Sequence, residues 1–207
     1  MSYRLCRPFL YLGTLAFVAV LCGCGPQGAS YNKRYFILDT ARADGPAGTN
    51  GKFILDVRRF TIDTAFESKG LVYRKGQLEH ESDFYNEFLI SPAVMITEKT
   101  RTWLSQSGLF TRVLDPGSRT EPTHTLEGNI TALYGDFRAK SAPKAVMEIR
   151  VFLIAERAQE GSIVLGKTYR TSLGVKSQDA KGLVEAFSQC LEIILTSLEK
   201  DLAESVL

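Results

Sequence analysis

The feature that most restricts the fold is a series of three long segments with strand-like patterning, at residues 123–137, 144–157 and 162–175. The middle segment alternates best, and its apolar residues share one face: Ala145, Met147, Ile149, Val151, Leu153 and Ala155. A period of two is the side-chain spacing of a β-strand. A turn at Gln159-Glu160-Gly161 separates the last two segments, and Gly128 in the first predicts a β-bulge. Together the three segments predict an antiparallel meander.

A long helix is predicted after the meander, at about Ala180 to Ser205. One narrow polar stripe runs along it, and most other positions are apolar: Leu183, Val184, Ala186, Phe187, Cys190, Leu191, Ile194, Leu195, Leu198 and Leu202. So wide an apolar face must be covered by the sheet, by another helix or by another subunit. Ordinary core packing is favoured, and an oligomer interface remains the alternative.

The first half of the chain predicts shorter elements. Strands are expected at 34–40, 52–62, 71–74 and 109–114, with 77–82 pairing with 71–74 through a turn at Lys75-Gly76. Ser91-Pro92 opens a helix, since Ser is a preferred N-cap and Pro fits the first helical position, and Gly108 ends it. The predicted fold class is α+β, a single domain in which a mixed, mostly antiparallel sheet is packed against two main helices.

The N-terminus has the pattern of a processed export signal. Arg4 and Arg7 precede an apolar run from Phe9 to Val20, which is followed by Leu21-Cys22-Gly23-Cys24. This stretch resembles the bacterial lipobox, although Cys22 stands where Ala, Ser or Thr is usual. The resemblance implies a lipoprotein signal peptide over 1–23, a flexible tether over 24–33 and a folded domain over 34–207. The alternative is a simple soluble export signal with an incidental cysteine.

If the lipobox is used, Cys24 carries the chain's covalent N-acyl and S-diacylglycerol lipid, and no other cofactor is expected. Several acyl chains would make membrane attachment practically permanent, because each buried CH₂ contributes about 0.8 kcal/mol. Gly25 follows Cys24 in place of the Asp that retains enteric lipoproteins at the inner membrane. We therefore expect localisation at the periplasmic face of the outer membrane.

Net charge and cysteine content argue against two classes of function, nucleic-acid binding and chemistry at a reactive thiol. The predicted signal holds two of the 25 basic residues and none of the 23 acidic ones, so the mature chain is neutral. A neutral chain offers no electrostatic case for a nucleic-acid partner. Cys190 is the only cysteine left after processing and acylation, and its apolar neighbours predict a buried, inert thiol.

The order of motifs along the mature chain resembles a known family. After Cys24 come Tyr35-Phe36-Ile37-Leu38, Val57-Arg58-Arg59-Phe60, Leu71-Val72-Tyr73-Arg74, Ser91-Pro92, Ser107-Gly108-Leu109-Phe110 and Leu126-Glu127-Gly128. This order is similar to that of the ABC-type transport auxiliary lipoproteins, which include paraquat-inducible protein C, although a Trp usual near Phe88 is absent. The resemblance implies a non-enzymatic accessory or scaffold subunit of an intermembrane lipid transport system. The implied partners are a mammalian-cell-entry (MCE) domain protein and, as in some relatives, further copies in a homo-oligomeric ring.

The residues suggest neither a metal site nor an enzyme, since no nucleotide-binding loop or nucleophile elbow appears. His80 lies between Glu79 and Glu81, a pattern typical of a solvated strand face. His124 lies between two threonines, and spatial neighbours that could complete a triad remain open. Two alternatives to the scaffold therefore remain, an anchored periplasmic hydrolase and a lipid-binding carrier lipoprotein.

One stretch is the leading candidate for partner binding. Phe66, Leu71, Tyr73 and Arg74 are proposed as its anchors, because aromatic and Arg side chains dominate protein interfaces. Nearby aromatic and aliphatic residues could join them in gripping a partner or a lipid tail: Phe84, Tyr85, Phe88, Leu89 and Ile90. The competing interpretation is ordinary core packing, with Tyr73 buried and Arg74 in a structural salt bridge.

Overall fold

The computed structural model describes residues 32–42, 51–156 and 162–206. Its elements are β1 (Arg34–Phe36), β2 (Ile54–Val57), β3 (Thr61–Ile62), η1 (Thr64–Phe66), β4 (Gly70–Arg74), β5 (His80–Phe88), α2 (Pro92–Gln106), β6 (Arg112–Val113), β7 (His124–Asp136), β8 (Lys144–Ala155), β9 (Ser162–Gly174) and α3 (Ala180–Val206). The predicted signal peptide, Cys24 and the turn at 159–161 lie outside the described residues. Among the described helices, none has the length and apolarity needed to cross a membrane.

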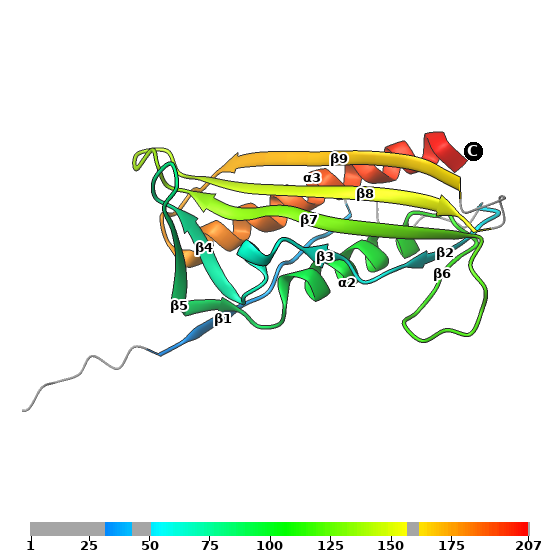
Figure 1. Cartoon of the computed structure of the whole chain (residues 1–207), viewed down its shortest axis with the longest axis horizontal. Coiled ribbons are helices and arrows are strands. Elements are labelled where there is room, and N and C mark those ends of the chain that lie inside the picture. The colour runs from blue at the N-terminus through cyan, green and yellow to red at the C-terminus, as the bar shows by residue number, and fades with distance from the viewer. Residues whose placement is uncertain (1–31, 43–50, 157–161, 207) are drawn as a thin grey trace, which may run out of the picture. The chain divides into compact units, whose positions relative to one another are not determined.

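Strand β7 organises the sheet (Figure 1). On one side β8 pairs with it antiparallel over nearly its whole length, and β9 pairs antiparallel with β8. On the other side three short strands share β7 in turn: β2, β3 and β4, all parallel to it. Beyond them lie β6, parallel to β2, and β5, antiparallel to β4, with β1 as an outer edge strand beside β5. Among the described strands five of the eight pairs are parallel, but the long antiparallel ladders contain most of the paired residues. The sheet is therefore mixed, and the predicted α+β class is confirmed.

Both helices cover the same face of this sheet (Figure 1). The alternating residues of β8 from Ala145 to Leu153 point into the layer between sheet and helices, and each is at most 1 % exposed. All ten apolar positions predicted for the last helix are also buried. Packing against the sheet therefore accounts for the wide apolar face of α3, whose buried residues join one core with those of the sheet.

The predicted strand at 34–40 is shorter than expected. After Phe36 the chain leaves the sheet, and its N–H groups bond to side chains of the helices instead. The N–H of Leu38 lies 3.1 Å from Sδ of Met95 in α2, and those of Asp39 and Ala41 donate to Ser188 and Glu192 in α3. Residues 37–42 thus form a strap across the helical layer.

Two further details correct the sequence predictions. The ladder runs regularly through Gly128, and the irregularity lies between Ile130 and Ala132. Glycine is required at 128 for another reason, since a Cβ there would lie 2.7 Å from the Phe60 ring. Similarly, the predicted strand at 52–62 divides into β2 and β3, while Gly108, at φ 73°, follows α2 as predicted.

Candidate interaction surface

The hairpin of β4 and β5 contains a large bulge. Val72 pairs with Ser82, whereas Gly70, only two residues earlier, pairs with Glu87. Residues 83–86 of β5 therefore stand opposite Leu71 alone, three residues more than a regular ladder holds, and they interrupt the pairing with β4. Bulges re-aim side chains, and here Phe84 and Tyr85 are 66 % and 42 % exposed. The bulge turns two aromatic side chains toward solvent.

Asp83 holds this bulge in shape. Its Oδ1 accepts hydrogen bonds from the backbone N–H groups of Tyr85 (2.8 Å) and Asn86 (3.0 Å). Its Oδ2 accepts from the Asn86 side chain (2.7 Å) and the Tyr73 hydroxyl (3.2 Å). Burial acts to raise the pKa of Asp83, but these donors outweigh it and the pKa is lowered. Asp83 is therefore a charged acceptor for four groups.

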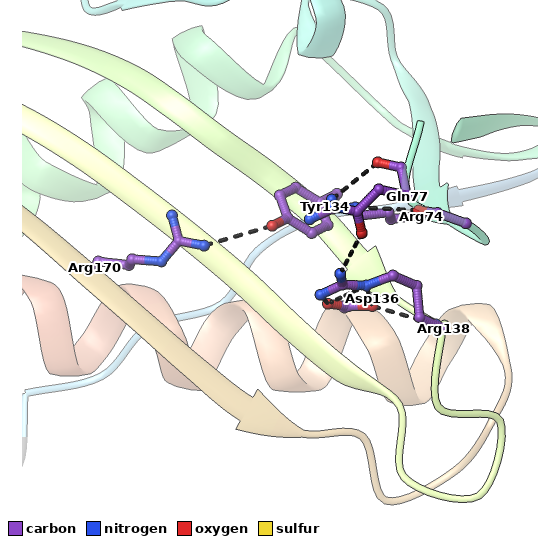
Figure 2. Close-up of polar contacts among 7 residues, drawn as sticks. Arg74, Gln77, Tyr134, Asp136, Arg138 and Arg170 are labelled. Atoms are coloured by element: carbon purple, nitrogen blue, oxygen red, sulfur yellow. Dashed lines mark hydrogen bonds and ion pairs between the residues drawn. The ribbon is translucent and has the colours of Figure 1, made fainter. Parts of the chain in front are cut away.

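The turn of the same hairpin is held by two arginines, as Figure 2 shows. Arg74 donates to the carbonyl oxygens of Gly76 (3.3 Å) and Gln77 (3.0 Å). Arg138, from the turn after β7, donates to both carboxylate oxygens of Asp136 and reaches Oε1 of Gln77 at 3.4 Å. Its hydrogen bonds also lower the pKa of Asp136. Two loops far apart in sequence are thus joined, and Leu78 at the hairpin turn is 94 % exposed.

The sheet face next to these loops is polar. Glu148 of β8 accepts from Arg170 of β9 (2.7 Å) and from Thr131 of β7 (2.6 Å), and these hydrogen bonds lower its pKa. Arg170 also reaches the Tyr134 hydroxyl across β8 at 3.5 Å (Figure 2). Charged groups on this face therefore pair across the strands, as expected for a solvated sheet surface.

The structure divides the predicted partner-binding residues. Leu71 is fully buried, and Phe66 is 9 % exposed and stacks on Tyr134, so both belong to the core. Tyr73 is half-buried and holds Asp83, while Arg74 supports the hairpin turn through carbonyl groups and not through a salt bridge among the described residues. Neither Phe66 nor Leu71 is presented to solvent, and direct partner contact by this stretch stays a prediction.

Exposed apolar residues gather instead along the β1 edge of the sheet. This edge cluster is defined by side chains between 41 % and 66 % exposed: Tyr35, Ile37, Phe84, Tyr85, Leu89 and Ile90. Register brings its two strands together, since Tyr35 pairs with Glu87 and the N–H of Leu89 donates to the Phe36 carbonyl. Sequence reasoning included Phe84, Tyr85, Leu89 and Ile90 but missed Tyr35 and Ile37, because alternation alone did not identify β1 as an edge strand.

A groove of about 280 Å³ runs between the strap and α2. Its apolar lining consists of Ile37, Leu38, Ile90, Met95 and Trp103, and polar or charged residues of the strap and α2 complete it. At its end Arg42 forms an ion pair with Glu199 of α3 at 2.7 Å and donates to the Gln106 carbonyl of α2. The Trp103 ring N–H donates to the same Glu199 carboxylate at 2.6 Å. The strap therefore ties both helices together.

The residues considered for catalysis lie apart. His80 is exposed on β5, 5.9 Å from the Tyr134 ring. His124 is buried beside Phe53 and Thr123, and burial lowers its pKa. Cys190 is fully buried, which raises its thiol pKa to about 12. In the part of the chain that the structure describes, no group of three or more His, Cys, Asp or Glu side chains converges on a metal position.

The comparison with family models decides the family. The model of the ABC-type transport auxiliary lipoprotein component matches residues 35–198. The chain belongs to this family. It is therefore an auxiliary lipoprotein of ABC-type transport, as the resemblance implied.

Solved structures support the fold. Protein XCC0632 from Xanthomonas campestris superposes with a TM-score of 0.66 at 17 % identity, over 84 % of this chain and 95 % of that protein. An uncharacterised protein gives a TM-score of 0.65 at 14 % identity, over 82 % of this chain and 98 % of the other. No curated protein matches the sequence.

Proposed function

We propose that this lipoprotein is a non-enzymatic adaptor anchored through an acylated Cys24 to the periplasmic face of the outer membrane. Its partner in this proposal is an MCE-domain protein of a lipid transport system. Membership of the auxiliary family supports the transport role. The sheet and both helices share one buried apolar core, which supports an adaptor over a carrier that would enclose its lipid between these layers.

The observation that carries this proposal is the pair of loops joined by hydrogen bonds at one end of the sheet. Loops on a rigid scaffold are the usual place for binding residues. Here Arg74 and Arg138 fix the hairpin turn, and Leu78 projects from it. An open hollow of about 410 Å³, lined by residues such as Arg138 and Lys144, lies beside the second loop. A partner side chain could enter this hollow while Leu78 enters the partner.

A photo-crosslinking side chain at Leu78 tests this function in the full-length protein in its own cell membranes. Mass spectrometry of the adduct is expected to identify an MCE-domain protein. The matched control is the same side chain at Ile163 on β9, which is 60 % exposed and lies on the opposite edge of the sheet. Adducts that lack an MCE-domain protein, or equal yields from both positions, would contradict the proposal.

Two substitutions extend this experiment. Cys24→Ser is expected to leave an unprocessed or soluble protein, because it removes the only acylation site that the lipobox offers. Arg74→Ala is expected to lower the adduct yield from Leu78 without unfolding the domain, because it frees the hairpin turn and leaves the core intact. Oligomeric rings, a further expectation of the family resemblance, are tested by mass measurement of the same purified protein.

A further inference from the structure

The edge cluster lies where the chain from Cys24 enters the folded domain. Lys33 directly precedes β1, and its ammonium group lies 4.0 Å from the centre of the Phe84 ring and 2.7 Å from Glu87. Arg34 donates to the Asn86 side chain at 2.9 Å. These contacts fix the entry point of the chain beside the bulge in β5. Any attachment upstream of Lys33 therefore pulls on this edge of the sheet.

The length of the chain before Lys33 limits how the domain can face the membrane. Cys24 precedes Lys33 by nine residues, which reach at most about 32 Å when fully extended. Strand β7 has 13 residues, so the sheet is roughly 43 Å long. The reach is therefore shorter than the domain. With Cys24 in the membrane, the surface around Lys33 meets the lipid more readily than the distant end of β9.

We propose that the edge cluster contacts the lipid headgroup layer of the membrane that holds the Cys24 anchor. This inference rests on the proposed acylation of Cys24 and goes beyond the partner binding described above. Tyr favours the boundary between water and lipid, because its ring combines an apolar body with a polar hydroxyl group. Phe and Leu are typical of the apolar face that a peripheral protein buries at this boundary. The cluster adds Ile37, Leu89 and Ile90 to these rings.

Contact of the edge cluster with lipid would be a second attachment to the membrane, in addition to the acyl chains on Cys24, and it would affect the orientation of the domain. Acyl chains alone hold the protein to the bilayer but leave its orientation free. Contact through the edge cluster fixes which face of the domain points to the lipid. The hairpin turn with Leu78 precedes the bulge on the same strand, β5, so the strand that touches the membrane also carries the turn proposed to bind the partner.

An environment-sensitive fluorophore on an introduced cysteine tests the contact. The acylated Phe84→Cys protein is labelled, reconstituted in vesicles of phosphatidylethanolamine and phosphatidylglycerol, and compared with the same protein in detergent-free buffer bound to an affinity resin. Labelling is selective, because Cys190 is 0 % exposed and Cys24 carries lipid. Ile163→Cys is the matched control, since its side chain is 60 % exposed at the far edge of the sheet.

The expected result is a blue-shifted, several-fold brighter signal from position 84 in vesicles, with quenching by a lipid-phase quencher and no change at position 163. An unchanged signal at position 84, or equal changes at both positions, overturns the inference while leaving the adaptor function standing. Vesicle flotation is measured in parallel. Protein that fails to float overturns the anchor itself and the membrane contact with it. The vesicles hold no other protein, so a signal change cannot come from a different partner. The lipid-phase quencher separates contact with lipid from contact with a second copy of this chain, because it acts only on a fluorophore that reaches the lipid.

Discussion

The β7–β8–β9 meander and the β4–β5 hairpin differ in how regularly their strands pair. The ladder of β7, β8 and β9 keeps its pairing over almost the full length of each strand. In its central strand, β8, every second side chain from Ala145 to Leu153 reaches the core. The β4–β5 hairpin loses its register between Gly70 and Val72, and four residues of β5 leave the ladder. Regular pairing buries side chains, whereas the bulge exposes them beside the chain's entry point.

The largest expected difference lies within the β4–β5 hairpin itself. Leu71→Ala should lower the free energy of unfolding by about 2–5 kcal/mol, because it leaves a cavity at a fully buried position. Phe84→Ala should change it by at most about 0.5 kcal/mol, because the ring is mostly exposed. Urea denaturation measures both. Equal losses from the two substitutions would show that the bulge is part of the core.

The regular ladder can be disturbed at one glycine. Gly128→Ala should cost about 1–3 kcal/mol of stability, because the added Cβ meets the Phe60 ring and forces it to move. Gly174→Ala at the end of β9 is the control, since nothing lies within 4 Å of its added Cβ. Thermal unfolding compares the two. If the Gly128→Ala protein is as stable as wild type, the Phe60 ring can move away from the added Cβ at no cost in stability.

The parts of the fold that follow from local periodicity could be predicted from the sequence. The alternation from Ala145 to Leu153 and the apolar face of α3 are each dictated by burial on one side. The strap and the bulge could not be predicted from the sequence, because both depend on contacts with residues that lie far away in the sequence. The strap ends β1 early through bonds to Ser188 and Glu192, more than a hundred residues away.

The candidate surface shows the same limit. Phe66 and Phe84 each lie within two residues of a Ser and an acidic residue. Yet Phe66 stacks on Tyr134, whereas Phe84 faces solvent. The local signal for the bulge was Asp83 with Asn86, since both residue types favour turns through side-chain bonds to the backbone. The aromatic residues around Asp83 and Asn86 favour a strand, so the two residues alone do not indicate a turn. The turn becomes apparent once β4 and β1 are known to pair with β5.

A smaller effect is expected where the bulge is held together. Asp83→Ala removes the acceptor for the N–H groups of Tyr85 and Asn86 and for the Tyr73 hydroxyl. By analogy with the loss of a helix cap, the expected cost is about 1 kcal/mol. Amide hydrogen exchange should quicken at residues 83–86 and stay unchanged in β8. Faster exchange throughout the sheet would instead make Asp83 part of the global core.

The smallest effect, and the most specific to the bulge, is its dependence on acid. The pKa of Asp83 is lowered in the folded protein from an ordinary value of 3.8. A lowered carboxyl pKa contributes stability that is fully present above the unfolded pKa and is lost as the pH falls through the folded one. Asp83→Asn removes this titration, so wild type should exceed the variant in stability at neutral pH. The difference should shrink once the pH falls below about 3.8.

Urea denaturation over a pH series gives this difference directly. Four other carboxylates also have lowered pKa values, and they titrate in both proteins and cancel in the comparison: Asp136, Glu148, Asp179 and Asp201. The difference in stability could instead stay constant down to pH values well below 3.8. The Asn side chain of the variant would then destabilise the bulge through its geometry, and the charge of Asp83 would not be what holds the bulge.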